Sequence, residues 1–175
     1  EHVPELIDAG IDSFKIEGRM KTALYVATVA RTYRKAIDDY LKDPKLYEAN
    51  MEWYKEEIGK CTYREFTTGF YFGKPGSDAQ IYNSNTYVKN YTYLGTVEEA
   101  DGKGRCRIEQ KNKFSVGETI EIMKPDGRNL EVVVKSICDE DGNEQESAPH
   151  PKQILWVDLG ADVDKYDILR KKEDN

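Results

Sequence analysis

The sequence predicts an α+β protein in which N-terminal helices are followed by a small antiparallel β-barrel. Two patterns of apolar residues indicate this. Within the first 60 residues, apolar side chains recur three and four positions apart, which is the period of an amphipathic helix. From about residue 85, short apolar segments are separated by Asp-Gly dipeptides, which is typical of strands joined by tight turns.

The first part, residues 1–60, is expected to contain three helices and one strand. The helices are expected over residues 4–9, 21–42 and 46–58, the last beginning at residue 46 or 50, and the strand over residues 11–18. Gly10 ends the first helix, and Asp43-Pro44 ends the second, because a residue before proline is pushed out of the α-helical region. The strand is predicted from the alternation of Phe14 and Ile16 with polar neighbours.

Residues 61–84 form an aromatic-rich connector. Phe66, Phe70, Tyr71 and Phe72 lie within seven positions, near glycines. We expect these rings to pack across the junction between two domains, since aromatic side chains are mostly buried against other groups. A platform on which a ligand stacks is the alternative.

The last part, residues 85–172, is expected to form the β-barrel. Its strands are expected over residues 91–98, 105–110, 119–123, 130–137, 154–159 and 167–170. Asp-Gly turns at residues 101–102, 126–127 and 141–142 tolerate the positive φ that hairpins need. In the second strand, Cys106 and Ile108 should face inward while the charged neighbours face water. Short strands at this spacing predict a closed or half-closed barrel.

Composition limits the classes of function. The net charge is −7, and residues 1–82 and 83–175 carry −2 and −5, so the composition disfavours a free-standing nucleic-acid binder. Cys61, Cys106 and Cys138 are far apart and odd in number, so neither a disulfide framework nor a metal site is expected. The sequence contains neither a signal peptide nor an apolar run long enough to span a bilayer, which predicts a cytoplasmic protein without membrane contacts.

The main candidate site is the charged cluster at the end of the predicted strand. Lys15 and Glu17 should share a strand face, and Arg19 follows Gly18 just before a helix. In parallel α/β architectures the loop after a strand is where sites are built, and an Arg fork binds carboxylate or phosphate. These residues are therefore substrate-binding candidates, while no catalytic residue is assigned. A local ion pair at the end of the strand is the alternative interpretation.

The sequence closely resembles the U-32 peptidase family, the collagenase-like peptidases. The first stretch that carries the resemblance is Gly10-Ile-Asp-Ser-Phe-Lys-Ile-Glu-Gly-Arg-Met-Lys21, followed by Tyr25-Val-Ala27 and Tyr33-Arg-Lys-Ala-Ile-Asp38. It continues in Phe66-Thr-Thr-Gly-Phe70, Phe114-Ser-Val-Gly-Glu118, Ala148-Pro-His-Pro151 and Asp167-Ile-Leu-Arg170. These stretches span nearly the whole chain.

The resemblance implies that residues 1–60 are the end of a TIM-type barrel and residues 85–172 a C-terminal β-barrel domain. The chain begins at Glu1 without Met, and we expect it to be the C-terminal fragment of a longer protein whose missing N-terminal barrel domain is its partner. The family is named for peptidase activity, while several members support hydroxylation of tRNA or other precursors, some with an iron–sulfur cluster. This chain has no four closely placed thiols, so we expect no cofactor here and any cluster in the missing N-terminal part.

Five further residues are weighed: three on a predicted helix, one in the connector and one histidine. Tyr33, Arg34 and Asp38 match the family but lie on a predicted helix, where a structural part in docking the helix is favoured over a site role. Glu65 replaces the small residue expected there, which makes a tRNA contact at this stretch doubtful. His150 has no Ser, Cys or carboxylate at triad-like spacing, so an ordinary loop histidine is favoured over a general base.

Two functions from different classes remain open. In the first, the chain is part of a collagenase-like peptidase, or alternatively of an RNA-modifying enzyme that supports tRNA uridine hydroxylation, and alone it is inactive. In the second, the β-barrel is a binding module for a protein, an RNA or a small ligand. A metallohydrolase is disfavoured, because only His2 and His150 could supply imidazole ligands.

Overall fold

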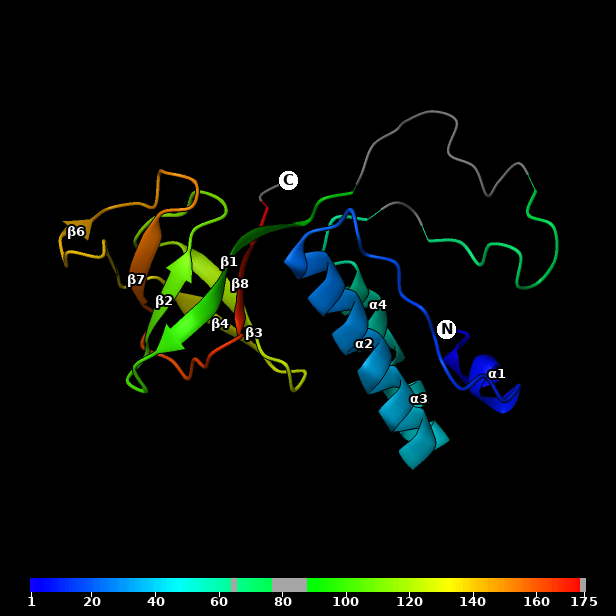
Figure 1. Ribbon diagram of the computed structural model, residues 1–175. Helices are drawn as coiled ribbons and strands as arrows, with labels where there is room; N and C mark the ends of the chain where they lie inside the picture. Colours follow the sequence, from blue (N-terminus) through cyan, green and yellow to red (C-terminus); the bar gives the residue numbers. More distant parts are fainter. Residues whose placement is uncertain (64–65, 77–87, 174–175) are drawn as a thin grey trace.

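A helical part lies beside a strongly curled sheet in the computed structural model, which describes residues 1–63, 66–76 and 88–173 (Figure 1). The helices are α1 (Val3–Asp8), α2 (Ala23–Lys42), α3 (Pro44–Ala49) and α4 (Met51–Ile58). The strands are β1 (Tyr91–Ala100), β2 (Arg105–Glu109), β3 (Thr119–Met123), β4 (Asn129–Val133), β5 (Ser136–Cys138), β6 (Glu144–Gln145), β7 (Ile154–Asp158) and β8 (Ile168–Lys172). The predicted α+β class is confirmed.

Side-chain caps set the boundaries of the helices. The Thr22 hydroxyl accepts a hydrogen bond from the Tyr25 backbone N–H at 3.2 Å and so begins α2. Asp43 ends α2 and caps α3, because its carboxylate accepts from the Lys45 N–H at 3.0 Å. The helix predicted over residues 46–58 is therefore two helices, separated at Asn50.

The strand predicted over residues 11–18 is wrong. These residues cross from α1 to the start of α2 without pairing to another strand (Figure 1). A strand needs a neighbour that binds its backbone N–H and C=O groups, and no strand in the described part of the chain lies beside this segment. As a result Ile16, expected to lie on one strand face with Phe14, is 38% exposed, and Ile11 is 43% exposed.

The sheet closes on itself through one bent segment. Its strand order is β4-β3-β8-β1-β2-β7-β5-β6, so β4 and β5 lie toward opposite ends. Only residues 134–135 separate β4 from β5 in the sequence, which brings the two ends of the sheet together. The strand predicted over residues 130–137 is thus split into β4 and β5, and β6 was not predicted. The predicted half-closed barrel is confirmed.

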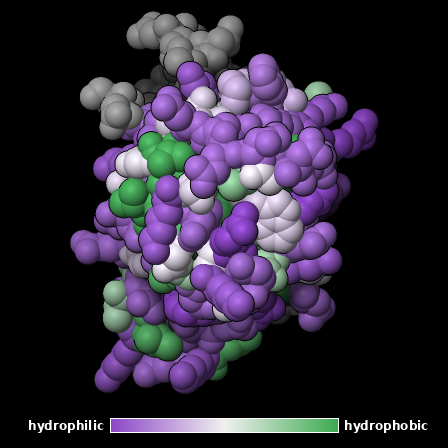
Figure 2. Space-filling view, turned by 90° about the vertical axis from the view of Figure 1, so that its left-hand side faces the viewer, coloured by the Kyte–Doolittle hydropathy of each residue, from purple (hydrophilic) through white to green (hydrophobic). Residues whose placement is uncertain are grey.

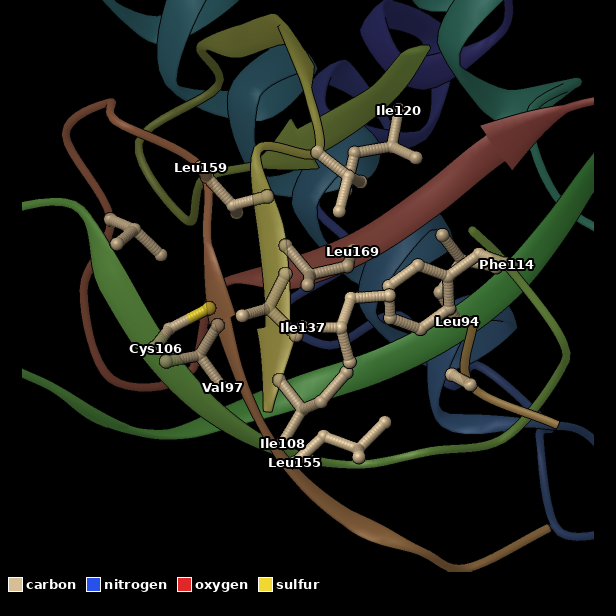
Figure 3. Packing of buried hydrophobic residues seen from close by; sticks show 14 of the residues in the cluster. Leu94, Val97, Cys106, Ile108, Phe114, Ile120, Ile137, Leu155, Leu159 and Leu169 are labelled. Carbon is tan, nitrogen blue, oxygen red and sulfur yellow. The ribbon is translucent and has the colours of Figure 1, made fainter. Parts of the chain in front are cut away.

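One apolar core fills the inside of this β-domain. Cys106 and Ile108 are fully buried, as the alternation in β2 predicted, and they pack with side chains from several other strands (Figure 3). Gly102, Gly127 and Gly142 have φ of 71°, 97° and 86°, which confirms the three predicted turns. Local turn chemistry and a period of two therefore account for most of this domain.

The connector does not pack as predicted. Phe70, Tyr71 and Phe72 are 78%, 73% and 63% exposed, and the segment loops away from the body after α4 (Figure 1). Tyr63 is held by a bridge to Val88 on the way to β1. The prediction that all these rings pin the junction is wrong: Phe66 stacks on Tyr63 and the Phe72 ring centre lies 4.5 Å from that of His2, while Phe70 and Tyr71 stay mostly in solvent.

The outer surface of the β-domain is polar. Figure 2 shows the face turned away from the helices, on which hydrophilic side chains dominate and apolar groups form only small separate spots. Among the residues that the structure describes, no helix is both long and apolar enough to cross a bilayer.

A buried ionic cluster joins the helices to the sheet. The Glu57 carboxylate of α4 accepts from Arg31 of α2, from Arg170 of β8 at 2.7 Å and from the Asn129 amide at 2.8 Å. Glu57, Arg170 and Arg31 are 1%, 0% and 8% exposed. Arg170 also donates to Glu121 of β3 at 2.6 Å. The Glu57 carboxylate therefore links α2, α4, β4 and β8, and β3 joins the cluster through the Glu121 carboxylate and Arg170.

Apolar contacts surround this cluster. Leu24 and Val29 of α2 pack with Cys61, Met123 and Ile168 between the helices and the sheet. Water is thus kept from the ions, which strengthens their attraction and also raises the cost of leaving any of them unpaired. The junction fixes the helical part relative to the β-domain.

Replacing Glu57 with Ala should destabilise the protein by about 3–5 kcal/mol, because it leaves Arg31 and Arg170 buried without their common partner. Urea denaturation followed by circular dichroism measures the change. Glu56→Ala on the exposed face of α4 is the matched control and should shift the unfolding free energy by less than about 0.5 kcal/mol. Equal small effects of both variants would contradict a stabilising junction.

Stability should also depend on acid through Glu57. Burial alone would raise the pKa of its carboxyl, but Arg170 and Arg31 hold this pKa below its usual value. The stabilisation is therefore present above the pKa of the unfolded chain, roughly 4.3, and is lost as the pH falls through the lower folded value. The difference in unfolding free energy between wild type and Glu57→Gln should shrink between about pH 5 and pH 3; a constant difference would contradict this.

Candidate functional site

The predicted site residues lie on one loop at the beginning of α2. Lys15, Glu17 and Arg19 are all exposed. The Glu17 carboxylate accepts a hydrogen bond from the Arg19 backbone N–H at 2.9 Å, and the Lys21 N–H donates to the Gly18 carbonyl at 2.9 Å. Local hydrogen bonds therefore bring Glu17 and Arg19 into one turn, while Lys15 lies in the extended segment just before it.

Gly18 is the position that lets this turn approach α2. A Cβ atom added at Gly18 would lie 2.7 Å from Val26 Cγ2, which is closer than two carbon atoms can come. The absence of a side chain thus allows the loop to rest on the first turns of α2. A larger residue would force either the Val26 side chain or the loop to shift.

The Lys15–Glu17 ion pair of the alternative interpretation is not formed. Within the described ranges Lys15 makes no ion pair, and Glu17 uses its carboxylate to fix the backbone of the turn instead. The pair was predicted from strand alternation, and without a strand the two side chains have no common face. The side chains of Lys15 and Arg19 consequently reach into solvent.

The electrostatic character of this loop differs from that of the whole protein. Lys15, Arg19 and Lys21 bring three cations to the N-terminal end of a 20-residue helix, where unpaired backbone N–H groups add partial positive charge. Lys21 Nζ lies 5.1 Å from the centre of the Tyr25 ring. The loop can therefore bind an anionic group despite the net charge of −7.

The three helix positions that match the family have structural surroundings. Tyr33 is half-buried and packs against two apolar clusters of the helical part. Arg34 donates through Nε to Asp38 at 2.9 Å in an exposed pair one turn apart. Such surface pairs contribute little to stability, so Arg34 and Asp38 form neither a junction nor a cavity wall.

No catalytic nucleophile is assembled by the described residues. Burial raises the pKa of the Cys61 thiol to about 11 and that of Cys106 to about 12, so both stay protonated at neutral pH. His150 is exposed in a turn and, across the described residues, its ring makes no hydrogen bond. Glu65 lies outside the described residues.

The cysteines also do not fit an iron–sulfur cluster. Cys61 lies in the apolar junction and Cys106 in the core of the β-domain, while Cys138 is on β5. A cluster of this kind needs several thiolates around one centre. In the part of the chain that the structure describes, no group of three His, Cys, Asp or Glu residues could hold a metal ion.

Two hollows lie outside the loop. A groove of about 910 Å³ lies between the helices and the connector and includes Val3, Ala36, Tyr54, Phe66 and Phe72 in its lining. A smaller cavity of about 540 Å³ lies on the outer face of the β-domain. Its lining includes Tyr93, Thr96, Glu98, Glu99, Arg107, Glu109, Lys111, Lys165 and Tyr166.

Sequence reasoning missed the buried ionic cluster that holds the loop and the β-domain together. Arg31 lies in the apolar stripe of α2, on the side of Leu24 and Thr28, which is an unusual place for a charge. That position was the available signal for Arg31. Neither Glu57 nor Arg170 could be paired with it from spacing, because 26 and 139 residues separate them from Arg31.

Comparison with known proteins gives two matches that together cover most of the chain. Residues 1–81 match peptidase family U32, and residues 89–170 match the peptidase family U32 C-terminal domain. The crystal structure of the C-terminal domain of a U32 peptidase from Geobacillus thermoleovorans is similar with a TM-score of 0.43 and 32% identity. That similarity covers 47% of this chain and 92% of the other.

Relatives with two kinds of name are similar to the chain. The tRNA hydroxylation protein P1 of Bacillus subtilis is 38% identical over 98% of this chain, and the tRNA hydroxylation protein P of Escherichia coli is 30% identical over 97%. A collagenase of Porphyromonas gingivalis is 38% identical over 61% of this chain and 28% of its own length. The chain spans 40% and 37% of the length of the two tRNA hydroxylation proteins. With both parts of the sequence matched, the chain belongs to peptidase family U32.

Proposed function

We propose that this chain is the C-terminal part of a protein that supports hydroxylation of tRNA, and that its cationic loop contributes to the place where the tRNA binds. The proposal rests mainly on the extent of the similarity. The match to the Bacillus subtilis tRNA hydroxylation protein P1 runs through 98% of the chain, whereas the match to the collagenase covers 61%. Both the helical part and the β-domain are therefore accounted for by the first relative.

The loop suits a polyanionic substrate. Lys15 and Arg19 extend into solvent beside the N-terminal end of α2, and Glu17 is occupied with the backbone of the turn. An Arg guanidinium donates two parallel hydrogen bonds to a phosphate, and a Lys ammonium adds a point charge. The loop thus offers phosphate contacts without a competing ion pair on either of these cations.

The β-domain would act as a second contact at a fixed place. The cluster around Glu57 ties it to α2 and α4, so it does not swing freely relative to the loop. A large substrate such as tRNA could touch both parts at once, and the binding energies of the two contacts would then add. This explains why a β-domain without a nucleophile accompanies the helical part.

Proteolysis is the second candidate, favoured by the similarity to the collagenase and by the groove of about 910 Å³, which is wide enough for a peptide. Against it stand the protonated thiols of Cys61 and Cys106 and the isolated position of His150. A peptidase of the Cys or Ser type requires a nucleophile within hydrogen-bond reach of a base. We therefore place proteolysis second.

Arg19→Ala should reduce tRNA hydroxylation about tenfold or more, because a charge-assisted phosphate contact is lost. The test uses a chimera in which this chain replaces the matching 172 residues of the Bacillus subtilis relative. The chimera is expressed in cells whose own gene for that relative is deleted. Hydroxylated uridine in tRNA is measured by mass spectrometry. Its melting temperature should hardly change, since Arg19 is exposed.

Arg34→Ala is the matched control for Arg19, because it removes an exposed Arg from the same helical part. It should leave hydroxylation unchanged. If Arg19→Ala lowers stability by several kcal/mol while hydroxylation per folded molecule stays constant, the loop is a structural element. A chimera that folds and produces no hydroxylated uridine would count against the proposed function itself.

The purified chain should not cleave gelatin or casein. The reason is the lack of a nucleophile and base in contact among the described residues, together with the raised pKa of the buried thiols. Release of fluorescent peptides from labelled gelatin measures the activity. Cleavage that disappears when one residue of this chain is replaced would restore the peptidase as the first candidate.

A further inference from the structure

We infer that the cavity on the outer face of β1 and β2 binds a single-stranded segment of RNA, with Tyr166 as a stacking platform for a base. The inference rests on the proposed function for the kind of polymer, and it adds a contact surface that the cationic loop does not include. Its starting point is the backbone of Tyr166.

Tyr166 is held in a conformation that its side chain disfavours. Its φ is +76°, in the left-handed region that glycine and asparagine adopt readily and a bulky residue rarely does. The Tyr166 N–H donates to the Val97 carbonyl at 2.9 Å, and the Val97 N–H donates to the Asp167 carbonyl at 2.8 Å. These bonds attach the turn to β1 where β1 bulges, between Val97 and Glu99.

The turn is also fixed from the other side. The Asp167 carboxylate accepts from the buried Lys124 ammonium at 3.0 Å and from the Asp164 N–H at 2.8 Å. A strained residue persists only where its surroundings determine its backbone, and such positions gather at functional sites. The surroundings meet this condition at Tyr166.

The ring of Tyr166 has no structural duty that explains the strain. It is 68% exposed, and its contact in the described structure is with Lys165, whose Nζ lies 5.1 Å from the ring centre. A glycine would form the same turn without a steric cost. The backbone of Tyr166 is thus fixed while its ring stays in solvent, where its face is open for stacking.

A second ring faces the same cavity. Tyr93 packs on one side against the junction cluster, and its hydroxyl lies 2.8 Å from Thr96 Oγ1. The Asn112 amide donates to the Tyr93 carbonyl at 2.7 Å. Tyr93 is thus immobilised before any ligand binds, which reduces the entropy lost on binding. The cavity volume of about 540 Å³ lies in the range of small-ligand sites.

Most charges around the cavity are paired with one another. Glu98 is paired with Arg107, and Glu109 is paired with Lys111. Among the described lining residues, Lys165 and Glu99 have no ion-pair partner, so Lys165 can bind a phosphate while Glu99 leaves one carboxylate beside the site. Aromatic rings beside a lysine are the arrangement that single-stranded nucleic acids use, with bases on the rings and phosphates on the cations.

Because most of the cations are already paired, stacking should dominate over charge. We expect the affinity for RNA to fall with salt as if one or two phosphates were neutralised. The logarithm of the association constant should then fall with the logarithm of the salt concentration with a slope of about −0.7 to −1.4. A steeper slope would indicate a broad cationic surface elsewhere on the chain.

The test is binding of a fluorescein-labelled oligouridine RNA to the full chain, followed by fluorescence anisotropy at low salt. Tyr166→Gly should weaken binding about tenfold or more, since stacking of one base is lost. The same substitution should leave the melting temperature unchanged or raise it, because it relieves the strain at φ +76°. Loss of function without loss of stability separates a binding ring from a structural one.

Matched variants define the controls. Tyr166→Phe keeps the ring and should bind as wild type, whereas Tyr71→Gly removes a ring of similar exposure from the connector and should not affect binding. If Tyr166→Gly lowers the melting temperature, Tyr166→Asn decides, because asparagine tolerates positive φ and has no ring. A folded Tyr166→Asn with wild-type affinity overturns the inference, as does absence of oligouridine binding by wild type.

The outcomes separate this site from the proposed function. Suppose that oligouridine binding depends on Tyr166 but the chimera forms no hydroxylated uridine. This result would support the site and reject tRNA hydroxylation. Hydroxylation by the chimera together with binding that ignores Tyr166→Gly would reject the site alone. If the wild-type chain binds gelatin peptides more tightly than oligouridine and Tyr166→Gly loses the peptide binding, RNA is rejected as the ligand.

Discussion

The carboxylate of Glu57 determines how the two parts of this protein are arranged. It accepts from Arg31 of α2, Arg170 of β8 and Asn129 of β4, so groups from positions far apart in the chain meet at two oxygen atoms. Taking such ions out of water costs several kcal/mol each, and the cost is offset only when every donor finds an acceptor. An arrangement with one member missing is therefore unfavourable, which makes the junction specific as well as stable.

This constraint gives the β-domain and the loop at the start of α2 a fixed relation. Arg31 lies about two turns after Ala23, where the continuous 20-residue helix α2 begins next to the loop. Arg170 lies in the middle of β8 and is the ladder partner of Tyr93 on β1. A rigid path of helix, ion cluster and strand consequently connects the cationic loop to the cavity of the β-domain, and a long polymer could meet both surfaces.

Much of the fold was predictable because its signals are local. Thr22 and Asp43-Pro44 mark the ends of α2 within two residues, and the Asp-Gly turns and the alternation in β2 locate the hairpins. The predictions that failed have a common cause: they depend on contacts between distant residues, which the spacing of apolar residues along the sequence does not indicate. Ile168, Leu169 and Arg170 are buried in succession, because β8 is covered on both faces, so a period of two gives no warning of a buried Arg170.

The candidate site was predictable in position but only partly in structure. Residue order placed Lys15, Glu17 and Arg19 on one segment, yet whether two of them pair depends on a strand whose partner is not in the described chain. Net charge does not describe the local field, because a phosphate responds mainly to charges within about 10 Å at physiological salt. In this protein many carboxylates, such as Glu57, Glu98 and Glu109, are already paired with cations of the same chain. The average of −7 thus describes the whole surface, while the cations that remain near Arg19 and Lys165 set the field that a nucleic acid would meet locally.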